Sequence, residues 1–358
     1  MKKTITLFAL AISLFATAQT PDVVAYYQGV DFNLNGLALK NQLATKISTT
    51  HANVLVYSQS WEALKITDAN AANTNQVVLL YGWENGIDSD YTNDLYRDNT
   101  LQDPGREGMY WNREHTFARS LGDPNLESGD LAPNGDIHHL RAADKKRNAN
   151  RGNLPFKTGT GNSKEISGGW YPGDNWKGDV ARMMMYMYVR YGERCLPTVV
   201  GIGSAANTPD AMIDLFLQWN AEDPVSAIEI QRNNYLGQSN NTYGQGNRNP
   251  FIDNPYLATK IWGGIPAQDT WGTLSTGTVE PFVYKVKIYP NPSYGTFTVQ
   301  AQDIISSIEI FNVTGQKIKV LQSNDVSKTI QVNDLPSGVY MVSVKTKSFT
   351  ETRKVVIN

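Results

Sequence analysis

The spacing of hydrophobic residues changes along this chain of 358 residues, and one kind of domain cannot account for both patterns. In the first part, GDVARMMMYMYVRYG (178–192) has the pattern of a helix and QVVLLYGW (76–83) that of a buried strand. Towards the end, short runs such as VYKVKIY and VYMVSVKT alternate apolar and polar residues between turn residues. The chain therefore predicts an α+β domain at 19–265, a linker at 266–282 and a small β-sandwich at 283–358.

The first 18 residues have the pattern of a secretory signal. A basic start precedes an apolar stretch over 5–15, and an A-x-A cleavage site follows at 16–18. The apolar stretch is too short to act as an anchor, and no later stretch reaches about 18 apolar residues. We therefore expect a secreted chain that begins at Gln19, stays outside the cell or on its surface, and does not insert stably into a membrane.

Net charge excludes one simple class of function for the first domain. The whole chain has a formal net charge of −2, but residues 19–280 hold 21 basic and 29 acidic residues. A domain with this excess of acidic residues is not a general electrostatic binder of nucleic acid. A function on nucleic acid would therefore require a local basic patch together with a cation.

Histidines cluster in one short region. The chain has four, and three of them are His115, His138 and His139, whereas we expect His51 at the surface. Around the cluster, MYWNREH predicts a strand, DIHHL a second strand after a long loop, and AADKKRNANR a helix. Residues at about 108–152 are thus predicted to form a strand–loop–strand–helix element.

This element carries the residue types that phosphodiester hydrolysis needs. Attack by water requires a base with a pKa near 7, which His115 can supply. A hard divalent cation stabilises negative charge and prefers oxygen ligands, which Glu114 and Asn148 offer. The predicted helix adds a local basic patch, made of Lys145, Lys146, Arg147 and Arg151.

Residues 112–156 resemble the endonuclease I family of nucleases, within the His-Me finger (ββα-metal) group. The matching motifs are Glu114-His115, DIHHL (136–140), then Asn148 ten residues after the first histidine of DIHHL, and Arg151 three residues further on. KGDVARMMMYMYVRY and QGNRNPFIDNP extend the similarity over most of residues 75–262.

The resemblance implies a ββα-metal finger in which His115 and Arg151 are catalytic and Glu114 and Asn148 bind one divalent cation. Mg²⁺ is the expected ion, with Mn²⁺ and Ca²⁺ as alternatives. The substrate would be DNA, with RNA as an open alternative, bound through its phosphates with little sequence preference. We expect cleavage to rise with pH through about 6–7, near the ordinary pKa of histidine. We also expect 5′-phosphate and 3′-hydroxyl ends, because a metal-bound water would protonate the leaving 3′-oxygen.

Four further residues around these motifs have less defined roles. His138 and His139 are interpreted as scaffold residues that hydrogen-bond within the element. Asp136 can orient one of these imidazoles. Arg119, like Arg151, is a candidate for contact with phosphate.

Three positions depart from the family pattern. Asn254 and Asn220 stand where histidine is common, and Ala142 stands where proline is frequent. None of them is at the expected base or metal position. Arg248 and Asn249, in QGNRNPF, can line the cleft, although a structural role in a turn is favoured.

The last segment resembles the C-terminal sorting domain of type IX secretion cargo in Bacteroidetes. The matching residues are KIYPNPSYGTF (287–297), GQKI (315–318), LPSGVYMVSV (335–344) and the final KVVIN. This resemblance implies that the type IX secretion machinery is a partner of the chain.

Two other functions remain open at this stage. A zinc-dependent extracellular hydrolase could use the histidines, although the chain has no HExxH motif and its one cysteine, Cys195, is expected to be a buried structural thiol. A non-enzymatic surface adhesin would fit the sorting domain. We expect the protein to be a monomer.

Overall fold

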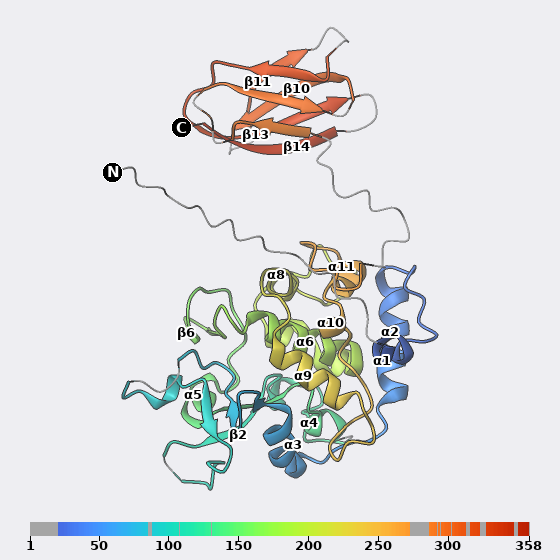
Figure 1. Ribbon diagram of the computed structural model, residues 1–358, viewed down its shortest axis with the longest axis vertical. Coiled ribbons are helices and arrows are strands. Elements are labelled where there is room, and N and C mark those ends of the chain that lie inside the picture. Colours follow the sequence, from blue (N-terminus) through green and yellow to red (C-terminus); the bar gives the residue numbers. More distant parts are fainter. Residues whose placement is uncertain are drawn as a thin grey trace, which may run out of the picture. The chain divides into compact units, whose positions relative to one another are not determined.

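The computed structural model describes residues 21–84, 88–106, 108–129, 131–272, 286–291, 293, 295–301, 303–312, 316–322, 327–346 and 350–357. The chain divides into two compact units, Met1–Leu274 and Ser275–Asn358 (Figure 1). The predicted signal at 1–18 and residues 273–282 of the predicted linker lie outside the described residues.

The first unit combines helices with small antiparallel sheets, as an α+β domain should. Its helices are α1 (Pro21–Tyr26), α2 (Gly36–Thr50), α3 (Ser60–Thr67), α4 (Ala132–Gly135), α5 (Lys145–Arg151), α6 (Lys177–Tyr191), α7 (Pro197–Val200), α8 (Asp214–Glu222), α9 (Ala227–Leu236), α10 (Pro250–Asp253) and α11 (Tyr256–Trp262). Its strands are β1 (Ala69–Asn70), β2 (Asn73–Val78), β3 (Tyr96–Asp98), β4 (Trp111–His115), β5 (Leu140–Asp144), β6 (Lys164–Ile166) and β7 (Gly169–Tyr171). They pair as β1-β2-β3, β4-β5 and β6-β7.

Helix α6 forms the centre of the first core. Every residue from Gly178 to Val189 is buried, and α2, α8 and α10 pack against the helix (Figure 1). The Met and aromatic residues of this segment are therefore core residues. The prediction of a helix here is also confirmed. Cys195, just beyond the helix, is fully buried, as expected of a structural thiol.

The first unit includes part of the segment predicted as linker. Ala267 and Trp271 are buried. The Trp271 ring lies 5.4 Å from Tyr27 and 5.1 Å from Phe32, between ring centroids. Periodicity could not reveal this, because Trp271 is an isolated aromatic residue among polar and turn residues.

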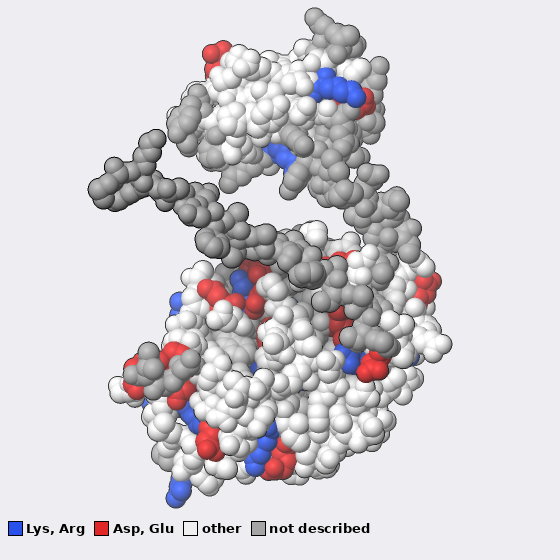
Figure 2. Space-filling model, in the orientation of Figure 1, with Lys and Arg blue, Asp and Glu red and all other residues white. Residues whose placement is uncertain are grey.

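Charged side chains are spread over the surface without a broad basic area on the face that Figure 2 shows, where blue and red atoms are interspersed. Much of the basic content of the first unit is inside it. The buried arginines are Arg97, Arg141, Arg151, Arg182, Arg232 and Arg248.

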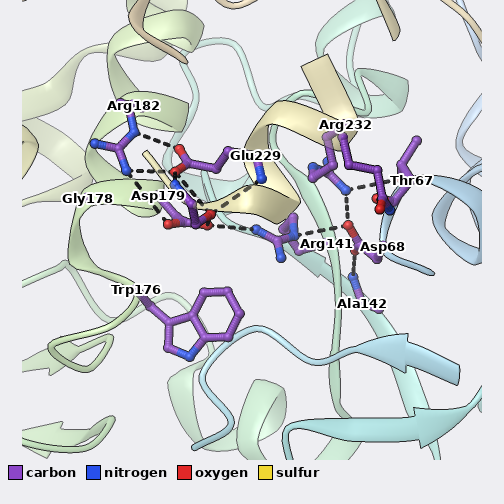
Figure 3. A network of polar contacts seen from close by, with 12 residues as sticks. Thr67, Asp68, Arg141, Ala142, Trp176, Gly178, Asp179, Arg182, Glu229 and Arg232 are labelled. Atoms are coloured by element: carbon purple, nitrogen blue, oxygen red, sulfur yellow. Dashed lines mark hydrogen bonds and ion pairs between the residues drawn. The ribbon is translucent and has the colours of Figure 1, made fainter. Parts of the chain in front are cut away.

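A buried ion-pair network joins helix α3, strand β5 and helix α9 (Figure 3). Asp68, which follows α3, accepts a 2.6 Å hydrogen bond from the backbone N–H of Ala142 in β5 and pairs with Arg232 of α9. Arg141 also pairs with Asp68, at 3.2 Å. Arg232 donates in turn to the carbonyl oxygens of Ile137 and Leu140, at 2.5 and 2.8 Å. One carboxylate therefore fixes the position of the strand that leads into α5.

A second cluster continues the network and ties α9 to α6 (Figure 3). Arg182 of α6 donates to both carboxylate oxygens of Glu229, at 2.6 and 2.7 Å. Asp179, one turn earlier on α6, pairs with Arg141 of β5 at 3.4 Å. The central helix is thus linked through buried charges to the strand that carries the candidate site.

The second unit is made of two antiparallel sheets that share one core. Its strands are β8 (Val286–Tyr289), β9 (Phe297–Ala301), β10 (Ile305–Asn312), β11 (Lys317–Gln322), β12 (Thr329–Val332), β13 (Gly338–Thr346) and β14 (Thr350–Ile357), in the sheets β11-β10-β13-β14 and β12-β9-β8. Val299 of β9 belongs to the same buried cluster as Ile310 of β10 and Val342 of β13. This arrangement is the predicted small β-sandwich.

No helix within the described ranges is long and apolar enough to cross a membrane.

The Asp68 network predicts a large loss of stability when its carboxylate is removed. In Asp68→Ala, the guanidinium groups of Arg141 and Arg232 lose their shared buried partner, and the free energy of unfolding should fall by about 3–5 kcal/mol. Urea denaturation measures this. Glu62→Ala, which removes a pair with Lys65 at the surface, is the control and should change stability by less than about 1 kcal/mol. A loss in Asp68→Ala as small as in the control would show that the network does not hold α3, β5 and α9 together.

Candidate active site

Strands β4 and β5 and helix α5 form one continuous element. The two strands pair antiparallel, with Trp111 opposite Asp144 and His115 opposite Leu140. Asp144 ends β5 and caps α5, because its side chain accepts a hydrogen bond of 2.9 Å from the backbone N–H of Arg147. The helix therefore starts directly where the strand ends, beside β4.

The second strand and the helix both begin later than the sequence predicted. DIHHL was predicted as the strand, but residues 137–139 form a turn and β5 covers Leu140–Asp144. The side chain of Asp136 accepts from the backbone N–H of His138 at 2.9 Å, which stabilises the turn. Ala142 and Ala143 are held in the strand by pairing with β4. This pairing overrides their helical propensity.

The element borders a cleft of about 550 Å³ that contains the predicted metal ligands and base. Glu114 and His115, at the end of β4, and Asn148, on α5, all line it. Arg113 and Arg119 supply positive charge in the same cleft. A carboxylate, an imidazole, an amide and two guanidinium groups are thus brought together by a short stretch of chain.

The imidazole of His115 is held by one residue of the long loop. Its Nε2 lies 3.0 Å from the backbone oxygen of Asn134 and 3.0 Å from Asn134 Oδ1. Two acceptors at Nε2 place the proton of the neutral ring there, so Nδ1 carries the free lone pair. Nδ1 has no hydrogen-bond partner among the described residues.

Burial decides the protonation state of this imidazole. It lowers the pKa of His115 well below its ordinary value, and the nearby charges of His139 and Arg119 act in the same direction against the hydrogen bonds to Asn134. The ring is therefore neutral at neutral pH, as a base must be.

Asn134 reaches His115 because the loop packs closely against a neighbouring segment. Helix α4 ends at Gly135, where a Cβ atom would lie 1.9 Å from the backbone oxygen of Leu55. Only glycine allows this approach. On the same side, the ring of Tyr57 lies 4.7 Å from the ring of His115 between centroids, and Arg113 lies over Tyr57 at 3.6 Å.

Glu114 is a buried carboxylate with one oxygen held and one available. Its Oε1 accepts a 2.8 Å hydrogen bond from the hydroxyl of Tyr81 and pairs with Arg151 at 3.3 Å. Oε2 has no partner among the described residues. Burial raises the pKa of Glu114 to about 7, although Arg151 and Tyr81 lower it. The carboxylate is therefore not fully compensated by the protein.

Asn148 is oriented by a residue across the strand–helix junction. Its Nδ2 donates to Oδ1 of Asn112 at 2.7 Å. With the amide nitrogen engaged, the amide oxygen remains free to act as a ligand in the cleft.

These donors fit the predicted cation. One carboxylate oxygen and one amide oxygen, without sulfur or imidazole, suit a hard ion such as Mg²⁺ or Mn²⁺ that keeps several waters. A zinc site takes three or four protein ligands. In the described part of the chain, no group of three or more His, Cys, Asp or Glu side chains is placed to hold a metal ion.

The side chain of Arg151 is not placed to contact a phosphate group in the cleft. It is fully buried and does not line the cleft. Its guanidinium donates to the carbonyl oxygens of His115 and Thr116, at 3.0 and 2.8 Å, besides pairing with Glu114. This burial favours a positioning role for Arg151.

The basic patch predicted on α5 is largely engaged elsewhere. Lys145 donates to Asp103, and Arg147 donates to Thr92 and Ser163. Lys146 is exposed. The arginines that line the cleft are instead Arg113 and Arg119, and Arg119 pairs with Glu127, which also lines it.

His138, His139 and Asp136 form the scaffold under the loop. Nε2 of His138 contacts the backbone oxygen of Asn247 at 3.1 Å, and Nε2 of His139 that of Pro133 at 2.7 Å. Both histidines therefore have the structural role expected of them. Asp136 accepts from the hydroxyls of Tyr186 and Tyr191 and from Gln245 rather than from an imidazole ring.

The remaining candidates do not line the cleft. Arg248 pairs with Asp253, and Asn249 caps α10, so both have the structural role favoured from the sequence. Asn220 and Asn254 are buried. His51 is half-buried and lies 3.2 Å from Gln245 between Nε2 atoms, not at the open surface as expected.

Four residues of the site were not expected from the sequence: Tyr57, Tyr81, Asn112 and Asn134. Asn112 stands two positions before Glu114 on the same strand, so the period of two places it on the same side of β4. Tyr57 and Tyr81 come from segments distant in sequence, and Asn134 lies in the long loop between β4 and β5, where its residue type does not mark it as a partner of His115.

Comparison with known proteins identifies the family. The sequence profile described as endonuclease I matches residues 35–256. The chain belongs to the endonuclease I family. It is 39% identical over 269 residues to an extracellular ribonuclease of Bacillus amyloliquefaciens, which covers 72% of this chain and 84% of that protein. An extracellular ribonuclease of Bacillus subtilis (strain 168) is 39% identical over 253 residues, covering 67% of this chain and 79% of its own length.

A second profile, that of a secretion system C-terminal sorting domain, matches residues 287–358. This endonuclease I family member is therefore a secreted nuclease that acts on nucleic acid, and type IX secretion delivers it to the exterior or the cell surface. The resemblances found in the sequence are confirmed for both parts of the chain.

Substitutions of Arg151 and Arg119 should change different properties of the protein. Arg151→Met should lower the free energy of unfolding by about 3–5 kcal/mol, because Glu114 loses its buried partner, and should lower kcat. It should leave the salt dependence of nucleic-acid binding unchanged. Arg119→Ala should keep stability and reduce the slope of log K against log salt by about 1, as one phosphate contact is lost.

Urea denaturation and fluorescence anisotropy with labelled DNA in EDTA measure both properties. A reduced salt slope with unchanged stability in Arg151→Met would return Arg151 to the role of phosphate contact.

Proposed function

We propose that this protein is a metal-dependent endonuclease that hydrolyses phosphodiester bonds of DNA and RNA with little sequence preference. The observation that carries the proposal is the state of His115. The ring is neutral, its Nε2 is bound to Asn134, and its Nδ1 is unpaired at a cleft that also holds the oxygens of Glu114 and Asn148. We infer that β4, β5 and α5 form a ββα-metal finger.

In this reaction His115 Nδ1 takes the proton from a water molecule as the water oxygen attacks phosphorus. Asn134 keeps Nδ1 free and then stabilises the imidazolium, because its oxygens accept from Nε2–H. Arg113 and Arg119 bind the phosphates of the strand. Glu114 and Asn148 would hold one divalent cation, Mg²⁺ by preference, which supplies neutralisation of the charge that develops at the scissile phosphate and the leaving 3′-oxygen.

Water as the nucleophile makes the sugar type unimportant. A ribonuclease that forms a cyclic phosphate uses the 2′-hydroxyl as nucleophile and needs an acid beside its base. The imidazoles of His138 and His139 are buried and contact backbone carbonyl oxygens, so neither is placed to act as that acid. Among the residues that line the cleft, the histidine is His115. The name of the two Bacillus relatives supports action on RNA, and the hydrolytic site extends this to DNA.

Three substitutions should separate the base from the metal ligands. His115→Ala should bind Mn²⁺ as the wild type does but lose roughly 10²–10⁴ of the cleavage rate. Glu114→Ala and Asn148→Ala should weaken Mn²⁺ binding, and excess Mn²⁺ should partly restore their rates. Calorimetric titration and plasmid nicking provide the two measurements, and EDTA should abolish nicking by the wild type.

His51→Ala serves as the matched control, because this histidine lies outside the cleft lining and should retain the wild-type rate. Near-wild-type turnover of His115→Ala at saturating metal would show that another group is the base.

Analysis of product ends tests the nucleophile. DNA and RNA oligonucleotides of matched sequence should both yield 5′-phosphate and 3′-hydroxyl ends, because the same water attacks in each. End-labelling and mass spectrometry distinguish these from other products. Cleavage of RNA alone, with 2′,3′-cyclic phosphate ends, would refute the hydrolytic mechanism.

A further inference from the structure

Tyr81 has a backbone conformation that a large side chain seldom adopts. It follows β2 and the buried residues Leu79 and Leu80, and its φ is +74°. A bulky residue in the left-handed region is unfavourable and persists only where the surroundings impose it. Such residues concentrate at functional sites. The contacts that hold Tyr81 therefore indicate what the conformation achieves.

Contacts at the carbonyl group of Tyr81 and at the next residue hold this turn. The hydroxyl of Ser163 donates to the carbonyl oxygen of Tyr81 at 2.7 Å. The next residue, Gly82, lies so close to Asp94 that a Cβ atom would be 2.2 Å from the Asp94 carbonyl oxygen. Trp176 donates to the Gly82 carbonyl oxygen at 2.7 Å. The chain is thus fixed where it leaves the strand.

The turn directs the tyrosine ring inward to the back of the cleft. The side chain is fully buried, packs edge-on against Trp170 at 5.4 Å between centroids, and ends with its hydroxyl 2.8 Å from Glu114 Oε1. Arg151 reaches the same oxygen at 3.3 Å. Two donors therefore converge on Oε1, while Oε2 keeps no partner among the described residues.

We propose that Tyr81 is a positioning residue that makes Glu114 a one-oxygen ligand and thereby favours a small octahedral cation over a larger one. This proposal rests on the proposed function, in which Glu114 binds the ion. Mg²⁺ and Mn²⁺ take single carboxylate oxygens in octahedral geometry, whereas Ca²⁺ readily accepts both oxygens of one carboxylate. Because Oε1 is bound to Tyr81 and Arg151, Glu114 does not bind the ion through both of its carboxylate oxygens.

The decisive comparison is Mn²⁺ against Ca²⁺ binding, measured by calorimetry on the full chain without nucleic acid. Tyr81→Phe keeps the ring and removes the hydroxyl. It should raise the Kd for Mn²⁺ by about tenfold or more, as substitutions of residues that hydrogen-bond to a metal ligand do. The Kd for Ca²⁺ should change by less than about threefold, because the freed Oε1 becomes a second ligand. The ratio of the two constants is the readout that a general loss of structure would not shift.

Tyr171→Phe is the matched control, because it removes a tyrosine hydroxyl from another carboxylate, that of Asp174, outside the cleft lining. It should leave both constants unchanged. If Tyr81→Phe fails to fold, Ser163→Ala tests the same role, because it releases the Tyr81 carbonyl and retains the hydroxyl. It should shift the ratio in the same direction by a smaller factor.

Glu114→Gln separates the two proposals. If this variant loses Mn²⁺ binding while Tyr81→Phe keeps the wild-type constants and ratio, Tyr81 does not position the ligand and the metal site stands. If Glu114→Gln binds Mn²⁺ as the wild type does, or if the wild type binds no Mn²⁺, Glu114 is not the ligand. Both proposals then fail.

Discussion

The site depends on the buried carboxylate of Asp68. Asp68 holds the backbone of β5 through Ala142 and, with Arg232, connects that strand to α3 and α9. Strand β5 then determines the register of β4 and the starting point of α5. Since Glu114 and His115 end β4 and Asn148 lies on α5, their relative placement follows from that strand. A short two-stranded ribbon is marginal on its own, so its geometry must be imposed from the surrounding core.

The convergence of the proposed base and metal ligands on one cleft could be predicted, because these residues lie close together in sequence. Glu114, His115 and Asn148 belong to one strand–loop–strand–helix element, and their residue types alone indicate a base with oxygen ligands. The residues that orient them could not be found in this way. Asn134 reaches His115 through the close approach of Gly135 to Leu55, and Tyr81 reaches Glu114 from the end of another sheet. Such contacts depend on tertiary packing, which periodicity does not encode.

The boundaries of elements failed for a related reason. Ala142, Ala143 and Asp144 have no strong preference for a strand, and in isolation they fit a helix that continues into α5. Hydrogen bonds with β4, and the bond that the backbone N–H of Ala142 donates to Asp68, make them a strand. Trp271 shows the same effect at the end of the first unit, where packing against Tyr27 and Phe32 outweighs a local composition typical of a linker.

Burial of arginine further reduces the positive charge that this acidic domain presents to nucleic acid. Six arginines of the first unit are internal, and those with partners in the Asp68, Glu229 and Glu114 clusters stabilise the fold instead of attracting phosphate. The face of the molecule drawn in Figure 2 accordingly has no broad basic area, and in the proposed function contact with substrate falls to Arg113, Arg119 and a cation in one cleft. Few phosphate contacts mean weak electrostatic binding, and a phosphate contact carries no information on base sequence. The burial of arginine and the reliance on one locally charged cleft are therefore linked, because positive charge that pairs with Asp68, Glu229 and Glu114 inside the first unit is not available to a substrate at its surface.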